Sequence, residues 1–223
     1  MKTLQLKGAI KKLLLLCLAL FIAAAAWLYL NEESTRRLKQ EAEIRTMDVI
    51  GKAAAKRLGG ENAGVTHGSA VELIKRPIEI RGVTDNIHYA TGVGNTVMIT
   101  TGDGVVVFDT GLVIQSARQL RLLKEPVSSG PVRYIILSHS HADHIGGTRF
   151  WAEENTQIVA HTQFEEEQRY LSELEPYQYG RNRILFPWMP SWEERPALKI
   201  MRYGGIQPTR TVDSWEVYSF DLG

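Results

Sequence analysis

The chain has 223 residues, of which 44% are hydrophobic and 23% are charged, and its formal net charge is +1. This length suits one ordinary domain with an appendage, and the balanced charge gives no reason to expect nucleic acid or a strongly anionic surface as a partner. The single cysteine, Cys17, excludes an intrachain disulfide framework and a cysteine-rich zinc site. Any metal site must therefore be built from histidines and carboxylates.

Residues 1–30 are predicted to be an export or membrane-anchor segment. Leu13–Leu30 carries no charge, and four lysines precede it. A helix of this length spans roughly 27 Å, close to the ~30 Å hydrocarbon core of a bilayer. Two interpretations stay open: an uncleaved transmembrane signal anchor, or a signal peptide cleaved near Ala23–Ala26. In both, the preceding lysines predict that the rest of the chain lies on the extracytoplasmic, periplasmic side.

Residues 31–70 are predicted to be a charged spacer. The segment Asn31–Gly60 is rich in charged, helix-forming residues and ends in two glycines, a helix-stop signal, whereas Glu61–Ser69 has the composition of a loop. We therefore expect a juxtamembrane helix that packs loosely on the domain that follows.

Residues 71–223 are predicted to form the domain. Short runs of strand-forming residues are separated by turn residues and followed by a helical pattern at Gln115–Lys124 and a buried strand at Arg133–Leu137. The strand-forming runs before that helix are Ile78–Ile80, His88–Ala90, Thr96–Thr100 and Val105–Phe108. Strands followed by a helix and a further buried strand indicate an α/β domain. Farther along, Glu165–Leu174 is predicted to be helical, and the aromatic and proline-bearing stretch after it an ordered loop.

Three histidines and an aspartate follow the buried strand within six residues. His139 and His141 are two residues apart, so in an extended segment their side chains point to the same side. Asp143 and His144 come where the chain turns towards a helix. Neutral imidazole and carboxylate groups suit Zn²⁺ or iron. The spacing therefore predicts two adjacent metal positions.

The segment HSHADHIGG resembles the signature of the metallo-β-lactamase superfamily, and GNTVMITTGDGVVVFDTGL resembles its opening hairpin, which ends in Asp109. The resemblance runs from about Gly82 to Gly223 and implies an αββα sandwich, of which this chain holds the N-terminal part. It also implies that His139 and His141 bind a first metal and that Asp143 and His144 bind a second. Asp109 would lie beneath the metals and orient their ligands, although a simple turn-forming role for it stays open.

The activity implied by this resemblance is that of a zinc-dependent hydrolase with two ions in its complete site. A metal-activated water would attack an ester, sulfate ester or amide in a small-molecule substrate. Asp143 is the predicted catalytic residue, because it would both bind metal and orient that water. No substrate-binding residue is singled out by the sequence.

The ligand set that the resemblance implies is incomplete. The family uses a later histidine, a bridging carboxylate and a last histidine, yet none of the six histidines lies after His161. We expect the second half of the sandwich, with these ligands, to lie outside this sequence. The alternative is that carboxylates replace the histidines.

The segments YQYGRNRILFP and GGIQPTRTVD resemble alkyl sulfatases of the same superfamily, and aromatic residues between His144 and Pro208 suit a substrate with an apolar portion. Three alternatives stay open: a β-lactamase or lactonase, an iron dioxygenase of the same fold, and a non-catalytic, membrane-tethered relic. Glutamates among the later ligands would favour the sulfatase, and histidines the lactamase.

Overall fold

The computed structural model describes residues 18, 27, 31–58, 74–75, 77–128, 130–185, 191, 205–213, 217 and 219. The predicted membrane segment Leu13–Leu30 lies outside these residues, apart from Leu18 and Trp27. Among the helices of the described part, none is both long and apolar enough to cross a membrane. The chain divides into two compact units, Met1–Ala42 and Glu43–Gly223.

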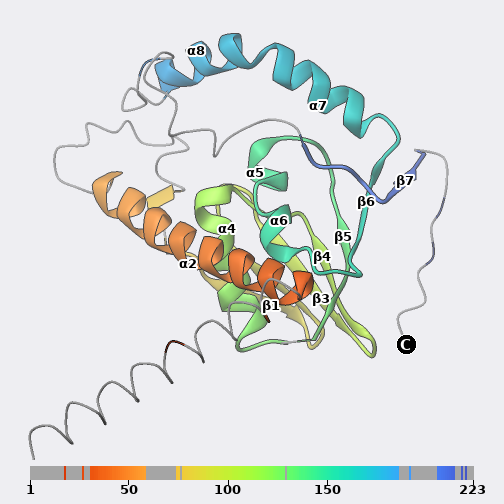
Figure 1. Ribbon diagram of the computed structural model, residues 1–223. Coiled ribbons are helices and arrows are strands. Elements are labelled where there is room, and N and C mark those ends of the chain that lie inside the picture. The colour runs from red at the N-terminus through yellow and green to blue at the C-terminus, as the bar shows by residue number, and fades with distance from the viewer. Residues whose placement is uncertain are drawn as a thin grey trace, which may run out of the picture. The chain divides into compact units, whose positions relative to one another are not determined.

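A single mixed sheet organises the second unit (Figure 1). Its strands lie in chain order, with β1 to β4 antiparallel and β4 to β7 parallel. The strands are β1 (Ile80–Thr84), β2 (Ile87–Ala90), β3 (Thr96–Thr101), β4 (Gly104–Phe108), β5 (Val132–Ile136), β6 (Gln157–His161) and β7 (Arg210–Val212). The described residues thus form a mixed α/β fold, in agreement with the predicted class. The second sheet of the expected sandwich is not among them.

Helices connect the parallel strands. Helix α4 lies between β4 and β5, α5 and α6 lie between β5 and β6, and α7 and α8 lie between β6 and β7. Their bounds are α4 (Val113–Lys124), α5 (Ala142–Ile145), α6 (Thr148–Trp151), α7 (Phe164–Glu173) and α8 (Glu175–Leu185). Helix α8 corrects the prediction of a loop after Leu174. Its proline, Pro176, lies in the first turn, where a proline costs no intrahelical hydrogen bond.

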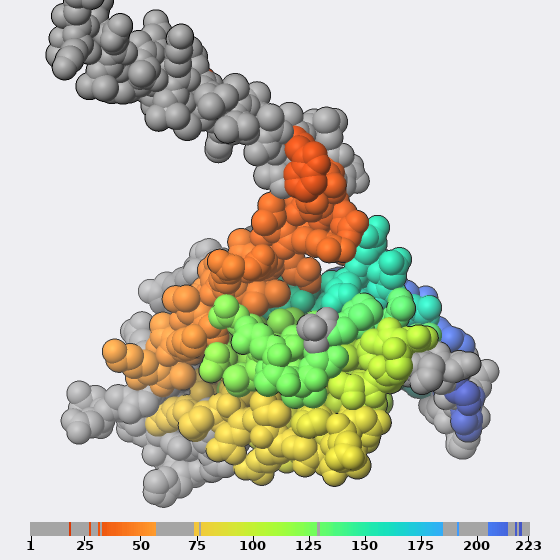
Figure 2. All heavy atoms as spheres, turned by 90° about the horizontal axis from the view of Figure 1, so that it is seen from below, coloured from red at the N-terminus to blue at the C-terminus, as the bar shows by residue number. Residues whose placement is uncertain are grey.

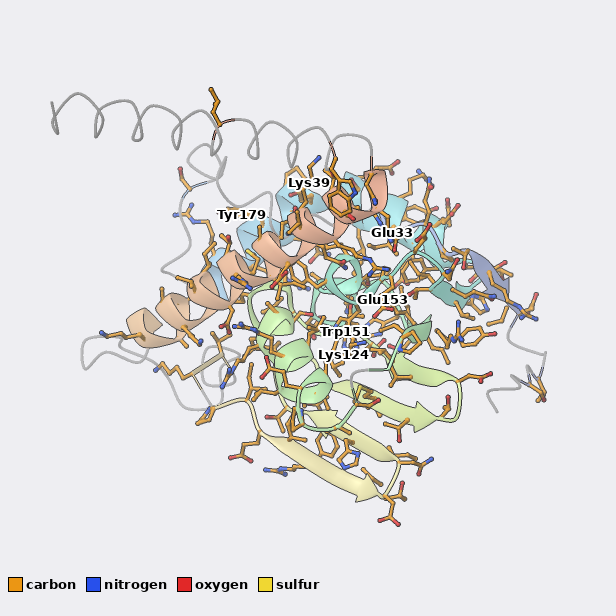
Figure 3. The ribbon with its side chains drawn as sticks, turned by 60° about the horizontal axis from the view of Figure 1, so that its bottom comes forward. Glu33, Lys39, Lys124, Trp151, Glu153 and Tyr179 are labelled. Atoms are coloured by element: carbon orange, nitrogen blue, oxygen red, sulfur yellow. The ribbon has the colours of Figure 1, made fainter. Side chains whose placement is uncertain are left out.

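The helix-facing side of the sheet forms the core. Side chains alternate across a strand, and the register places Met98, Val107 and Ile135 side by side on this face. All three are fully buried and pack in one cluster with Leu123 of α4 and Trp151 of α6. An ion pair between Lys124 Nζ and Glu153 Oε1, 3.0 Å apart, joins α4 to the segment after α6 near Trp151 (Figure 3).

The opposite face of the sheet is also apolar. Val97, Phe108 and Ile136 lie side by side on it, by the same register. Phe108 is 39% exposed, and the other two are partly buried.

Helix α2 (Glu32–Leu58) forms much of the charged segment. From Glu43 onwards it belongs to the second unit. There Met47 is buried against Val113, Ala117 and Phe150, and this part of the orange helix lies against the green surface of α4 (Figure 2). Its buried Asp48 accepts a hydrogen bond from Arg121 of α4 at 3.0 Å.

Candidate metal centre

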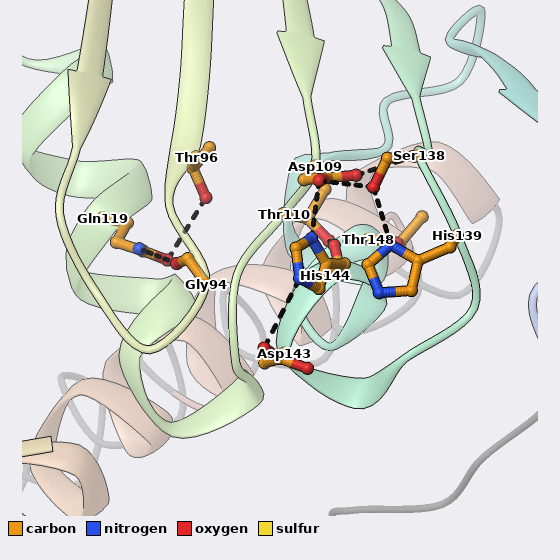
Figure 4. Close-up of polar contacts among 10 residues, drawn as sticks. All are labelled: Gly94, Thr96, Asp109, Thr110, Gln119, Ser138, His139, Asp143, His144 and Thr148. Atoms are coloured by element: carbon orange, nitrogen blue, oxygen red, sulfur yellow. Dashed lines mark hydrogen bonds and ion pairs between the residues drawn. The ribbon is translucent and has the colours of Figure 1, made fainter. Parts of the chain in front are cut away.

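The candidate residues follow the ends of two neighbouring parallel strands (Figure 4). Phe108 of β4 pairs with Ile136 of β5, so the residues just after each strand meet at one edge of the sheet. Asp109 follows β4 in a left-handed conformation, with φ of 51°, which aspartate tolerates better than most residues. The histidine motif follows β5, and its last part forms the short helix α5.

Asp109 is the centre of a hydrogen-bond network that includes two of the three histidines. Its Oδ1 accepts from the backbone N–H of Ser138 at 2.8 Å. Its Oδ2 accepts from Ser138 Oγ at 2.8 Å and lies 2.7 Å from His144 Nδ1. Ser138 Oγ lies in turn 2.9 Å from His139 Nδ1. Asp109 therefore contacts His144 directly and His139 through a hydroxyl.

The predicted ligands lie close together. The ring centroid of His139 is 4.6 Å from that of His141 and 4.0 Å from that of His144. Asp143 Oδ2 lies 3.4 Å from His144 Nε2. Burial, and then the neighbouring His144 and His141, hold the pKa of His139 below its ordinary value, which favours the neutral, metal-binding form of the ring.

These donors fit a divalent metal ion in kind, because they are imidazoles and a carboxylate. His144 uses Nδ1 for Asp109, which leaves Nε2 as its possible metal-binding atom. Within the described part of the chain, no group of three or more His, Cys, Asp or Glu side chains is arranged to hold a metal ion. The four predicted ligands therefore lie close together, but the described residues do not form a complete metal-binding site.

A second polar network, centred on Gln119 of α4, borders the first. Gln119 is fully buried, and its Nε2 donates to the carbonyl oxygens of Gly94 at 2.9 Å and Thr91 at 3.2 Å. Its Oε1 accepts from Thr96 Oγ1 at 3.2 Å. These bonds hold the loop between β2 and β3, and a Cβ added to Gly94 would lie 1.8 Å from the backbone oxygen of Asp143.

Sequence reasoning assigned no role to Ser138 or Gln119. The only local signal for Ser138 was a hydroxyl directly before the first histidine, and nothing local marked Gln119. His161 ends β6, where its Nδ1 accepts from the backbone N–H of Gln163 at 3.1 Å.

Two curated proteins align with part of this chain. The chain is 36% identical over 84 residues to the probable metallo-hydrolase YybB of Bacillus subtilis, an alignment that covers 37% of this chain and 36% of that protein. It is 31% identical over 70 residues to the alkyl/aryl-sulfatase BDS1 of Saccharomyces cerevisiae, which covers 30% of this chain and 11% of that protein. The chain thus matches little more than a third of the first relative and about a tenth of the second.

Among solved structures, BJP-1, a subclass B3 metallo-beta-lactamase of Bradyrhizobium japonicum, matches with 21% sequence identity and a TM-score of 0.47. That match covers 68% of this chain and 51% of the other. The family model of the metallo-beta-lactamase superfamily matches residues 89–204, more than half of the sequence. The chain therefore belongs to the metallo-β-lactamase superfamily.

Proposed function

We propose that the chain forms part of a zinc-dependent hydrolase whose metals bind at the histidine motif. The observation that carries this proposal is the gathering of His139, His141, His144 and Asp143 after the ends of β4 and β5. Asp109 contacts His144 directly and His139 through the hydroxyl of Ser138. Membership of the superfamily supports it.

The residues divide into ligands and supports. His139 and His141 would hold one ion, and Asp143 and His144 a second. Zinc bound there would supply a Lewis acid and an activated water for attack on the substrate. Asp143, beside His144 Nε2 at 3.4 Å, would orient that water and act as the catalytic carboxylate. Asp109 would keep the His144 ring in a fixed orientation.

For the substrate we propose a small molecule with a hydrolysable ester, sulfate ester or amide and an apolar portion. One relative is named an alkyl/aryl-sulfatase, which favours the sulfate ester. The α7–α8 segment exposes Tyr170 (52%) and Tyr177 (68%), and such aromatic side chains suit an apolar group.

The sequence supports a membrane-anchored or secreted protein whose domain lies on the periplasmic side, because the charge-free run Leu13–Leu30 follows four lysines. Protease treatment of spheroplasts tests it. Digestion of the domain from outside is expected, and full protection of the domain would contradict this location.

Replacing His141 with alanine tests the proposed chemistry. The complete protein that contains this chain is assayed with p-nitrophenyl sulfate, p-nitrophenyl acetate and a chromogenic β-lactam, and its zinc content is measured. Because His141 is a proposed ligand, His141→Ala should lower metal-dependent turnover at least about 100-fold and reduce bound zinc. The preferred reagent identifies the substrate class.

The control is His161→Ala, which removes a histidine at the end of the neighbouring strand β6 and should leave turnover and zinc content unchanged. Equal activity in His141→Ala and the unmodified chain would refute the proposed ligand set. If the complete protein that contains this chain binds no zinc and hydrolyses none of the reagents, the non-catalytic alternative is favoured.

A further inference from the structure

Resting on the proposed metal centre, we propose that Ser138 is a positioning residue that keeps the proton of the His139 ring on Nδ1 and so leaves Nε2 free to bind metal. The position of this proton follows from how the available protons are distributed among the short contacts around Asp109 (Figure 4).

The hydroxyl of Ser138 lies between a carboxylate and an imidazole. Its Oγ is 2.8 Å from Asp109 Oδ2 and 2.9 Å from His139 Nδ1. A carboxylate only accepts hydrogen bonds, and a hydroxyl has one proton to donate. The Ser138 proton therefore points to Asp109, and the remaining contact requires a proton on His139 Nδ1. In a neutral ring, Nε2 then carries the lone pair.

The reverse arrangement is disfavoured by the same distances. If Ser138 donated to His139 Nδ1, its oxygen lone pairs would face Asp109 Oδ2 at 2.8 Å with no proton between them. Asp109 Oδ2 already lies 2.7 Å from His144 Nδ1, so His144 is likewise required to carry its proton on Nδ1. Asp109 Oδ2 thus orients two rings, that of His144 directly and that of His139 through Ser138.

The side chain of Ser138 can be tested separately from its backbone. The backbone N–H of Ser138 donates to Asp109 Oδ1 at 2.8 Å, and Ser138→Ala keeps this bond while removing only the hydroxyl. Ser138→Thr restores a hydroxyl. Ser140 supplies a matched control, because its buried hydroxyl lies two residues away and has no hydrogen-bond partner among the described residues.

The first measurement is the position of the ring proton in the metal-free full chain, by NMR of ¹⁵N-labelled histidine side chains. We expect His139 to carry its proton on Nδ1 in the unmodified chain, in Ser138→Thr and in Ser140→Ala. In Ser138→Ala a population protonated on Nε2 should appear. A merely structural role for Ser138 would not move this signal.

The second measurement is zinc affinity against a competing chelator. Ser138→Ala should bind zinc about 10- to 100-fold more weakly than the unmodified chain, and Ser138→Thr should restore binding to within a few-fold. A His139 proton on Nε2 in the unmodified chain, or no change of ring proton or affinity in Ser138→Ala, would overturn the inference. Because the NMR experiment needs no metal, failure of the complete protein to bind zinc would contradict the proposed function separately.

Discussion

Asp109 and Gln119 each centre a polar network at the same edge of the sheet. The Gln119 network joins α4 to the loop between β2 and β3, and both polar atoms of this fully buried side chain are hydrogen-bonded. The Asp109 network joins β4 to the histidine motif. This network uses Nδ1 of His139 and of His144 and makes no hydrogen bond to Nε2 of either ring.

We infer from this difference that the Gln119 network contributes to stability and that the Asp109 network prepares a binding site. A buried network with every group bonded holds the backbone in one conformation and offers nothing to a ligand. A network bonded on one side only fixes the orientation of its rings and leaves their other sides for a ligand. The two networks meet where Gly94, held by Gln119, packs against the backbone of Asp143. The Gln119 network therefore supports the backbone beside the Asp109 network.

Replacing Gln119 with leucine should produce the largest loss of stability. The carbonyl oxygens of Thr91 and Gly94 and the hydroxyl of Thr96 would lose their partner in a buried place. We expect the free energy of unfolding, measured in urea by circular dichroism, to fall by about 2–4 kcal/mol. Gln163→Leu, at an exposed position, is the control. A loss no greater than in that control would contradict the stabilising role of Gln119.

Replacing Asp109 with asparagine should instead lower zinc affinity more than it lowers stability. Asparagine tolerates the left-handed backbone conformation and keeps the shape of the side chain. Whichever way the amide turns, however, one of the two acceptor oxygens becomes a donor, so at least one of the three bonds from Ser138 and His144 loses its acceptor. Zinc affinity, measured against a chelator, should fall about 10- to 100-fold. Unchanged affinity, or a loss of stability as large as that of Gln119→Leu, would refute the distinction between the networks.

The proximity of the histidines was predictable because it depends on local spacing. His139, His141 and His144 lie within six residues after a strand, so any turn there keeps them close. The position of Asp109 followed from the resemblance, and the parallel pairing of β4 and β5 explains it. The proximity of the histidines needed no distant contact, whereas the contact between Asp109 and His144, 35 residues later in the chain, was accessible only through the resemblance.

The hydrogen-bond partners were not predictable in the same way. Gln119 bonds to a loop about 25 residues earlier in the chain, and a helical pattern does not say which neighbour its buried face meets. The role of Ser138 depends on the direction of one hydroxyl, which the sequence leaves open. Helix α8 was missed because its aromatic and proline residues have the composition of a loop as well as of a helix.

Replacing Thr96 with valine makes the smallest and most selective change to the Gln119 network. Thr96 is fully buried, and its hydroxyl donates one 3.2 Å bond to Gln119 Oε1. Valine keeps the branched shape and removes only that donor, so the free energy of unfolding in urea should fall by about 1 kcal/mol. Thr162→Val, at an exposed position, should change it less. Because Thr96 has no bond to Asp109 or to the histidines among the described contacts, zinc affinity should stay within a few-fold of the unmodified chain. A large loss of affinity in Thr96→Val would mean that the two networks act as one.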